Sequence, residues 1–188
     1  LHRVDRRQRQ MCIRDSNHPS DILFADTETT GMTRDREVIE LGIVDLAGNV
    51  LLDQRFLTYL PIHYKATEVH GITNSMLLRC PHPCSMTEQI HEIFKNKIVI
   101  FYNKSFDVGS IENSFEGFSG QTSKIHCMLK AYKEYNRTGL SNKLMDACRR
   151  HNVAINDLNA HSAVDDALAT QRLTLKLMQQ HYQYSLPR

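Results

Sequence analysis

Apolar runs of strand length alternate with polar segments along the first third of the chain. Ile22–Ala25 is such a run, and Asp26 follows it directly. Residues 38–45 and 50–58 form two further runs, separated by a turn at residues 47–49. Because a short turn between two strand-length runs is typical of a hairpin, the pattern predicts an antiparallel meander that begins at the Asp26 strand.

The pattern changes to alternating helices and strands after residue 85. Ile90, Ile93 and Phe94 recur at helical spacing, which predicts a helix over residues 86–95. A strongly β-prone run at residues 98–102 predicts a buried strand. The same reading continues with a helix over 106–118, a strand over 124–129, a helix over 142–151 and a long final helix over 160–181.

A meander followed by alternating helices and strands indicates an α/β fold. We expect a ribonuclease H-like architecture, with a five-stranded mixed central sheet flanked by helices. The chain of 188 residues, 41% of them hydrophobic, can bury a full core, so residues 18–188 are expected to form one domain. Residues 1–17 lack apolar periodicity and are expected to be a non-native or disordered segment, with a basic arm on a nucleic-acid backbone as the alternative.

Composition narrows the class of protein. No apolar run is long enough to span a bilayer, and no signal peptide opens the sequence, so we expect a soluble, cytoplasmic protein without a membrane partner. The five cysteines are scattered and do not suggest a disulfide framework. The net charge of +2 comes from residues 1–17, which carry five arginines and two aspartates, so the remainder has a net charge of −1. Phosphate binding must therefore be local or supplied by metal ions.

The first polar motif, Asp26-Thr27-Glu28-Thr29-Thr30-Gly31, begins at Asp26, on which the first strand is expected to end. In extended backbone, residues two positions apart project to the same side, so the carboxylates of Asp26 and Glu28 are expected to lie on the same side of the strand. Two carboxylates at that spacing repel each other unless a cation lies between them. Gly31 then allows the chain to turn away.

Two later motifs carry further carboxylates and a histidine. Asp107 follows the strand at residues 98–102 and should stand near the start of a helix, where it either faces the first strand or only stabilises the helix N-terminus. His161 and Asp166 lie five residues apart, and Asp165 competes with Asp166 for the carboxylate role. His161 titrates in the range suited to a general base, although a lone histidine at a helix start is often only a surface residue.

Together these side chains form the ligand inventory of a two-metal phosphodiesterase. Hard divalent cations prefer oxygen ligands, and two ions can hold the attacking and the leaving oxygen of a phosphoryl displacement. The three motifs, in this order, resemble those of the DEDDh 3′→5′ exonucleases, the group that includes the proofreading epsilon subunit of bacterial DNA polymerase III. The resemblance spans about residues 21–178 and includes Val69-His70-Gly71-Ile72-Thr73 between the first two motifs.

The resemblance implies a role for each motif residue. It selects Asp166 over Asp165, because the family pattern places four residues between histidine and aspartate. Two Mg²⁺ or Mn²⁺ ions would be held by Asp26, Glu28 and Asp166, with Asp26 bridging and Asp107 completing the site. His161 would be the general base. The residues expected to seat the 3′-terminal nucleotide are Thr27, Thr29, His70, Asn103 and Phe106.

The implied activity is hydrolysis at a nucleic-acid 3′ end that releases nucleoside 5′-monophosphates. Single-stranded DNA is the expected substrate, and the enzyme would act alone or as the partner of a DNA polymerase. The alternatives are an RNA 3′-end trimming enzyme and a non-catalytic nucleic-acid-binding module. Two other features have weaker functional interpretations. The segment Cys80-Pro81-His82-Pro83-Cys84 contains zinc-type ligands, but such a segment is more often a surface loop. A single-strand binding surface could be formed by Tyr132, Lys133, Tyr135 and Arg137, but such a pattern is more often a solvated helix face.

Overall fold

The computed structural model describes residues 19–136 and 139–185, so the predictions for residues 1–17 and for Arg137 lie outside the described residues. The strands are β1 (Ile22–Thr29), β2 (Val38–Asp45), β3 (Val50–Arg55), β4 (Ile98–Phe101) and β5 (Lys124–Cys127). The helices are η1 (Pro19–Asp21), α3 (Tyr64–His70), α4 (Asn74–Leu77), η2 (Pro83–Met86), α5 (Thr87–Phe94), α6 (Lys104–Ser114), α7 (Phe118–Gln121), α8 (Met128–Tyr135), α9 (Leu144–Arg150) and α10 (Ala163–Ser185).

The sheet has the strand order β3-β2-β1-β4-β5. The strands β1, β2 and β3 pair antiparallel as a meander, whereas β4 pairs parallel with both β1 and β5. Both parallel connections run through helices, as crossovers between parallel strands require. The predicted five-stranded mixed sheet, with a meander at its start, is therefore confirmed.

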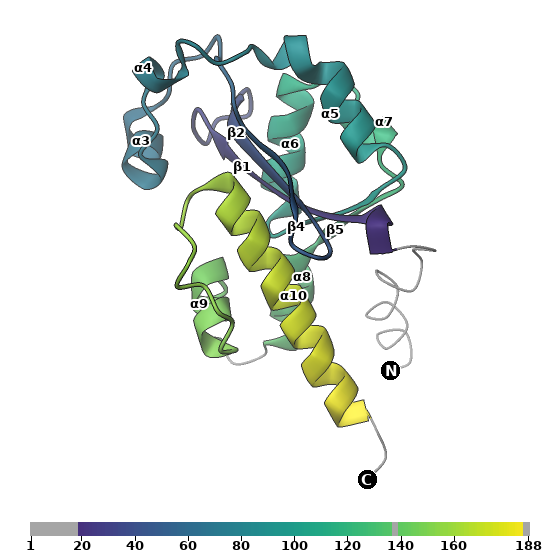
Figure 1. The fold of residues 1–188 in the computed structure, drawn as a ribbon. Helices are drawn as coiled ribbons and strands as arrows, with labels where there is room; N and C mark the ends of the chain where they lie inside the picture. The colour runs from purple at the N-terminus through teal and green to yellow at the C-terminus, as the bar shows by residue number, and fades with distance from the viewer. Residues whose placement is uncertain (1–18, 137–138, 186–188) are drawn as a thin grey trace.

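Alternate residues of β1 pack into two separate cores, one on each face of the sheet. Figure 1 shows the helices that lie on the two sides of the sheet. Ile22 and Phe24 pack in the core that α8, α9 and α10 cover. Leu23 and Ala25 pack in the core that α5, α6 and α7 cover. Because side chains alternate along a strand, this parity also decides which helix layer each later residue of β1 faces.

The first strand is longer than its apolar run. It was predicted to end on Asp26, but β1 continues to Thr29 because Thr27 and Glu28 keep their pairing with β2. The ladder shifts register only between Glu28 and Thr29. The two carboxylates of the first motif are therefore held by sheet hydrogen bonds, and not by a loop.

Several predicted boundaries differ because apolar spacing merged neighbouring elements. The predicted helix over 106–118 is two helices, α6 and α7, which are separated at Gly117 by a left-handed backbone with φ of 83°. Ile111, Phe115 and Phe118 are all fully buried, which made them look like one helical stripe. The predicted strand over 124–129 ends at Cys127, where α8 begins.

The helix α8 corrects the interpretation of the mixed aromatic and basic segment. Tyr132 is fully buried, and its hydroxyl accepts a hydrogen bond from Arg150 Nη1 at 2.6 Å. Tyr132 therefore belongs neither to a solvated helix face nor to a binding surface. Lys133 and Tyr135 of the same helix are exposed.

Residues 59–85, for which the apolar pattern predicted no element, contain α3 and α4. These short helices pack on a small separate core of Ile39, Ile62, Ile72 and Leu77. In the zinc-type segment that follows, Cys80 Sγ lies 3.8 Å from the Met76 carbonyl oxygen. Within the described residues, the segment does not form a cluster of three ligand atoms close enough to share a metal ion.

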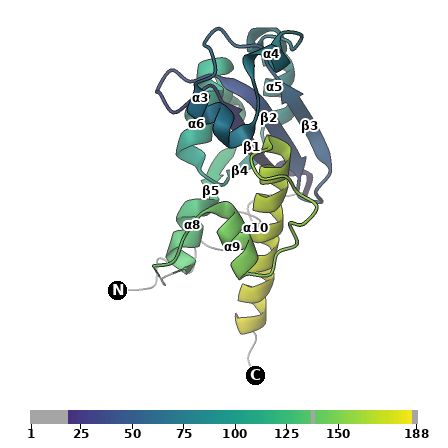
Figure 2. The same ribbon diagram turned by 90° about the vertical axis from the view of Figure 1, so that its left-hand side faces the viewer.

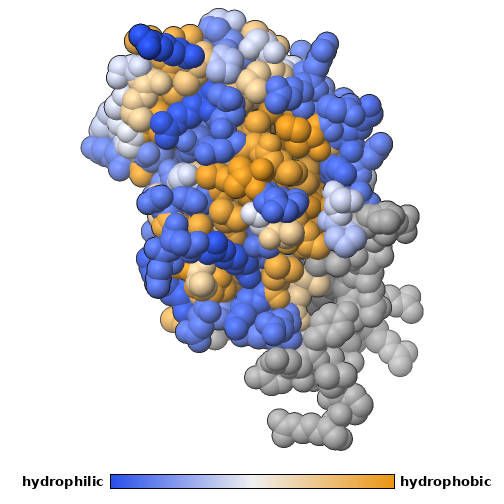
Figure 3. Space-filling view, in the orientation of Figure 1, coloured by the Kyte–Doolittle hydropathy of each residue, from blue (hydrophilic) through white to orange (hydrophobic). Residues whose placement is uncertain are grey.

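The edge strand β3 leaves apolar side chains exposed. Val50 is 52% and Leu51 is 46% exposed, and Figure 3 shows a band of hydrophobic side chains across this face with hydrophilic residues on both sides. No helix in the described part of the chain has the length and apolarity needed to cross a membrane. The carboxylates of the three motifs come from β1, α6 and α10, and not from β3.

Candidate active site

Asp26 and Glu28 lie on the face of β1 that α10 covers. They share the parity of Ile22 and Phe24, whose side chains belong to the core beneath α10. Across the antiparallel ladder, Asp26 pairs with Gly42 and Glu28 pairs with Glu40. The predicted projection of both carboxylates to one side follows from the continuous strand.

Asp107 approaches the same carboxylates from the other helix layer. It lies in the first turn of α6, is only 2% exposed, and accepts a hydrogen bond from the Thr27 hydroxyl at 2.9 Å. The alternation of β1 places Thr27 on the α6 face, where its hydroxyl fixes the orientation of this carboxylate. The α6 start is itself held by the Asn103 carbonyl, which accepts from the amides of Phe106 and Asp107.

Asp166 and His161 enter from the start of α10. His161 precedes the helix, in a left-handed conformation with φ of 65°, and its backbone N–H donates to Asp166 Oδ2 at 3.3 Å. The final helix was predicted to begin at residue 160, but Ala163 is its first residue. His161 therefore lies outside the helix, and helix geometry does not set the direction of its side chain. One ligand atom from each of Glu28, His161 and Asp166 lies within 4.8 Å of the other two.

The position of the α10 start depends on two β2 residues that the motif analysis did not identify. The Ala163 N–H donates to Glu40 Oε2 at 2.9 Å, and Arg55 Nε donates to Glu40 Oε1 at 2.8 Å. A Cβ atom on Gly42 would lie 2.2 Å from the Val164 nitrogen, so the helix can sit here only because residue 42 has no side chain. A buried glutamate within an apolar strand, followed by glycine two positions later, was the available sequence signal.

Burial makes the cluster electrostatically costly. It raises the pKa of Asp26 well above its ordinary value, and the other three carboxylates raise it further. Burial also raises the pKa of Glu28 to about 9, with Asp166 the largest of the neighbouring charges that add to the effect. Like charges in a weakly polarisable environment disfavour ionisation of each other.

The two remaining carboxylates have partners that oppose this trend. Burial raises the pKa of Asp107 to about 7, and the hydrogen bond from Thr27 acts against it. Burial raises the pKa of Asp166 to about 6, and His161 acts against it. Without a cation, the cluster would therefore retain protons at neutral pH.

These features fit divalent metal ions. Asp166 Oδ1 is buried and has no hydrogen-bond partner among the described residues, although buried oxygens are normally paired. The donor set is rich in carboxylate oxygen, which Mg²⁺ and Mn²⁺ prefer. A cation would give Asp166 Oδ1 a partner and would relieve the repulsion between the carboxylates.

The raised pKa values predict how stability depends on pH when metal is removed. In chelator, we expect the free energy of unfolding to fall as pH rises from about 5 to about 9, because the folded protein keeps protons that the unfolded chain has already released. The decline should be steepest at about pH 5–6, where the unfolded carboxyls are already ionised and the folded cluster still holds its protons. It should become shallower as pH passes the pKa values of about 6 for Asp166, about 7 for Asp107 and about 9 for Glu28. Thermal unfolding with chelator, compared with Mg²⁺, measures this effect. Mg²⁺ should restore stability mainly at the alkaline end, and equal melting temperatures with and without Mg²⁺ at every pH would contradict the prediction.

The residues predicted to seat a nucleotide come from β1, α3 and the start of α6, and they differ in exposure. Thr29 is buried, and its hydroxyl donates to the Gly31 carbonyl at 2.9 Å. Asn103 is exposed, and one face of the Phe106 ring is covered by the Arg36 guanidinium at 4.1 Å.

His70 has features of a ligand-facing side chain. Burial lowers its pKa, and the Thr29 backbone beside it acts in the opposite direction. Its Nδ1 accepts from the Ile72 amide at 3.0 Å, whereas its buried Nε2 has no partner among the described residues. The role of these residues in seating a nucleotide remains a prediction.

Comparison with known proteins supports the same family. The RNase_T family model, described as an exonuclease, matches residues 23–174. The DNA polymerase III subunit epsilon of Buchnera aphidicola from Acyrthosiphon pisum is 30% identical over 81% of this chain and 70% of its own length. An uncharacterised exonuclease of Escherichia phage 186 is 28% identical over 80% of this chain and 84% of its own length.

Solved structures confirm the ribonuclease H-like fold. Exonuclease X, in complex with 5′-overhanging duplex DNA, matches with a TM-score of 0.67 and 19% identity over 85% of this chain and 92% of its own. The nuclease domain of 3′hExo, a DEDDh family member bound to rAMP, matches with a TM-score of 0.68 and 13% identity over 88% of this chain and 94% of its own. With its three motifs brought to one end of the sheet, this chain belongs to the RNase_T exonuclease family and is of the DEDDh type.

Proposed function

We propose that this chain is a metal-dependent 3′→5′ exonuclease that hydrolyses DNA from its 3′ end and releases nucleoside 5′-monophosphates. The observation that carries the proposal is the convergence of Glu28, His161 and Asp166 around a buried carboxylate oxygen that has no partner among the described residues. An imidazole beside a cluster of oxygen ligands provides a proton acceptor next to a place for cations. This combination suits hydrolysis of a phosphodiester by water.

Two Mg²⁺ or Mn²⁺ ions would be held by Asp26, Glu28, Asp107 and Asp166. When bound, such ions offset the charge of the scissile phosphate and lower the pKa of a water molecule. The protein keeps the carboxylates ready through the Thr27 hydrogen bond to Asp107 and the His161 N–H bond to Asp166. Pre-positioned ligands reduce the reorganisation needed when substrate arrives.

His161 is the proposed general base. It is exposed and lies outside α10, so its ring can reach a water molecule at the carboxylate cluster and then release the proton to solvent. The buried carboxylates are occupied as metal ligands and cannot serve the same purpose. Thr27, Thr29, His70, Asn103 and Phe106 would orient the terminal nucleotide so that its phosphate faces His161.

DNA is the proposed substrate because relatives with about 30% identity are DNA polymerase III epsilon subunits. The same relatives support a polymerase as a candidate partner. Incubating 5′-labelled single-stranded DNA, duplex DNA and RNA with Mg²⁺, with and without chelator, tests direction, polymer and metal need together. Ladders that shorten from the unlabelled end of DNA are expected. Degradation of RNA alone would show that the substrate is RNA and not DNA. The absence of degradation with any divalent ion would overturn the proposed function.

His161→Asn should lower kcat by ~10²–10⁴-fold, because it removes the proposed base. Asparagine is the suitable replacement, since it tolerates the left-handed backbone that residue 161 adopts. Binding of a single-stranded oligonucleotide in Ca²⁺ should stay near wild type, because Ca²⁺ supports ligand contacts without positioning the attacking water. His82→Asn, at a histidine outside the carboxylate cluster, is the control and should retain activity. Wild-type turnover by His161→Asn would exclude His161 as the base.

A further inference from the structure

A groove of about 410 Å³ lies beside the carboxylate cluster, between the β4 to α6 turn and α8. Its lining is Asn103, Cys127, Leu129, Lys130, Lys133 and Glu134. Asn103 connects the groove to the cluster, because its carbonyl holds the first turn of α6 on which Asp107 lies. The groove therefore begins one turn away from a proposed metal ligand.

Lys130 and Lys133 are both exposed and lie three residues apart on α8, which puts them on one side of the helix. Some lysines of the described chain are paired, as Lys95 is with Glu92 and Lys97 with Asp21. Within the described residues, neither groove lysine is within ion-pair distance of a carboxylate. With Glu134 as the acidic residue of the lining, the groove carries a net charge of +1.

The groove faces the side of the molecule at which β1 and β4 end. Figure 2 looks onto this side and shows α3 and α6 above, α8 and α9 below, and α10 beside them. A nucleic-acid strand whose last phosphate reaches the carboxylates must leave the site across one of these rims. The α8 rim provides two lysines and a net charge of +1 next to Asn103, whereas the carboxylate cluster itself repels phosphate in the absence of cations.

We propose that this groove binds the backbone of the strand being degraded, with Lys130 and Lys133 donating to phosphates on the 5′ side of the scissile phosphate. The proposal rests on the proposed exonuclease function. Lysine ammonium groups act as point charges toward phosphate and do not read bases, so the groove would hold any sequence. It would favour a long strand over a short one, because only a long strand has phosphates that reach it.

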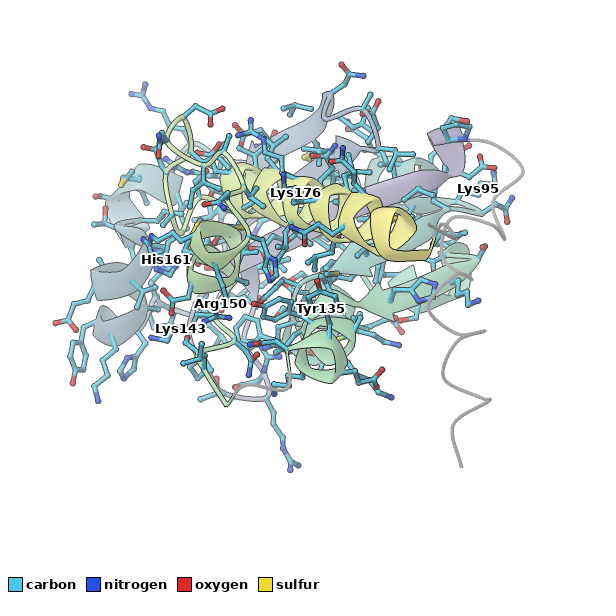
Figure 4. All side chains as sticks on the ribbon, turned by 90° about the horizontal axis from the view of Figure 1, so that it is seen from below. Lys95, Tyr135, Lys143, Arg150, His161 and Lys176 are labelled. Carbon is cyan, nitrogen blue, oxygen red and sulfur yellow. The ribbon has the colours of Figure 1, made fainter. Side chains whose placement is uncertain are left out.

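The test compares two double variants that remove the same charge. Lys130→Ala/Lys133→Ala changes the groove, and Lys95→Ala/Lys176→Ala removes two lysines that lie away from His161 in Figure 4. Each protein is assayed in Mg²⁺ on a single-stranded oligonucleotide at several salt concentrations. The p-nitrophenyl ester of thymidine 5′-monophosphate, which has no upstream phosphates, is the second substrate.

For the groove variant, we expect KM for the oligonucleotide to rise about tenfold at low salt and the logarithmic salt slope to shrink by about 1.4, the value for two phosphate contacts on a single strand. The ratio of kcat/KM for the oligonucleotide to that for the ester should fall accordingly, whereas the control variant should keep the wild-type ratio. An unchanged KM and slope, or an equal loss on both substrates, would overturn the groove assignment. If the wild type hydrolyses neither substrate, the proposed function fails instead.

Discussion

Asp26→Asn is expected to abolish metal-dependent hydrolysis and, in the same metal-free protein, to raise the melting temperature. The two effects have one cause. Asp26 is the carboxylate whose pKa is raised by burial and by all three neighbouring carboxylates, so it experiences the whole cluster. The negative charge that binds a cation destabilises the folded protein when no cation is present.

The expected loss of kcat is at least ~10³-fold, or about 4 kcal/mol of transition-state stabilisation, because an amide cannot replace the charge of a carboxylate ligand. The expected gain in metal-free stability at pH 8 is on the order of 2 kcal/mol, or roughly 4–8 °C for a domain of this size. Oligonucleotide hydrolysis in Mg²⁺ measures the first effect, and thermal unfolding in chelator measures the second.

Glu92→Gln is the control, because Glu92 is an exposed acid near the end of α5, just before β4 begins, whereas Asp26 lies in the second half of β1, beyond the residues that pair with β4. It should change neither turnover nor the response of the melting temperature to Mg²⁺. If Asp26→Asn hydrolyses DNA at the wild-type rate, Asp26 is not a metal ligand. If it loses activity and also stability in chelator, the loss reflects misfolding and not removal of a ligand.

The local chemistry of this site could be predicted from sequence, because β1 uses the two-residue period of a strand. Once Ile22–Ala25 is recognised as a strand, Asp26 and Glu28 must project together. The sequence also predicted that Asp107 lies near the start of a helix, although that helix begins at Lys104 and not at residue 106. Between Asp165 and Asp166, however, residue spacing alone left the choice open, and the family resemblance selected Asp166, which lies with Glu28 and His161 in the structure.

What the sequence did not predict depends on contacts between distant segments. The Thr27 hydroxyl bonds Asp107 across 80 residues, and the Ala163 amide bonds Glu40 across 123. Tyr132 looked like a surface aromatic because its neighbours are basic, yet α8 turns it into the core. Local periodicity contains no information about such pairings, which depend on where one helix layer crosses the sheet.

Gly42→Ala should displace the start of α10 and separate Asp166 and His161 from the carboxylates of β1. The added Cβ would lie 2.2 Å from the Val164 nitrogen and 2.4 Å from the Ala163 carbonyl carbon, and backbone atoms cannot rotate away as a side chain can. Overpacking of this kind costs about 1–3 kcal/mol of stability. Gly42 pairs with Asp26, so the displacement occurs directly above the site.

We expect a loss of kcat of ~10²-fold or more for Gly42→Ala, since misplacing catalytic groups by about 1 Å can cost that much. The matched control is Gly120→Ala in α7, where an added Cβ meets no atom within 4 Å and helix propensity favours alanine. Circular dichroism and the Mg²⁺-induced rise in melting temperature separate displacement from unfolding, because a folded Gly42→Ala protein with a displaced helix should keep its secondary structure yet bind Mg²⁺ weakly. A folded variant with wild-type turnover and Mg²⁺ response would show that α10 tolerates the shift, and the close approach at Gly42 would then be a packing feature that catalysis does not need.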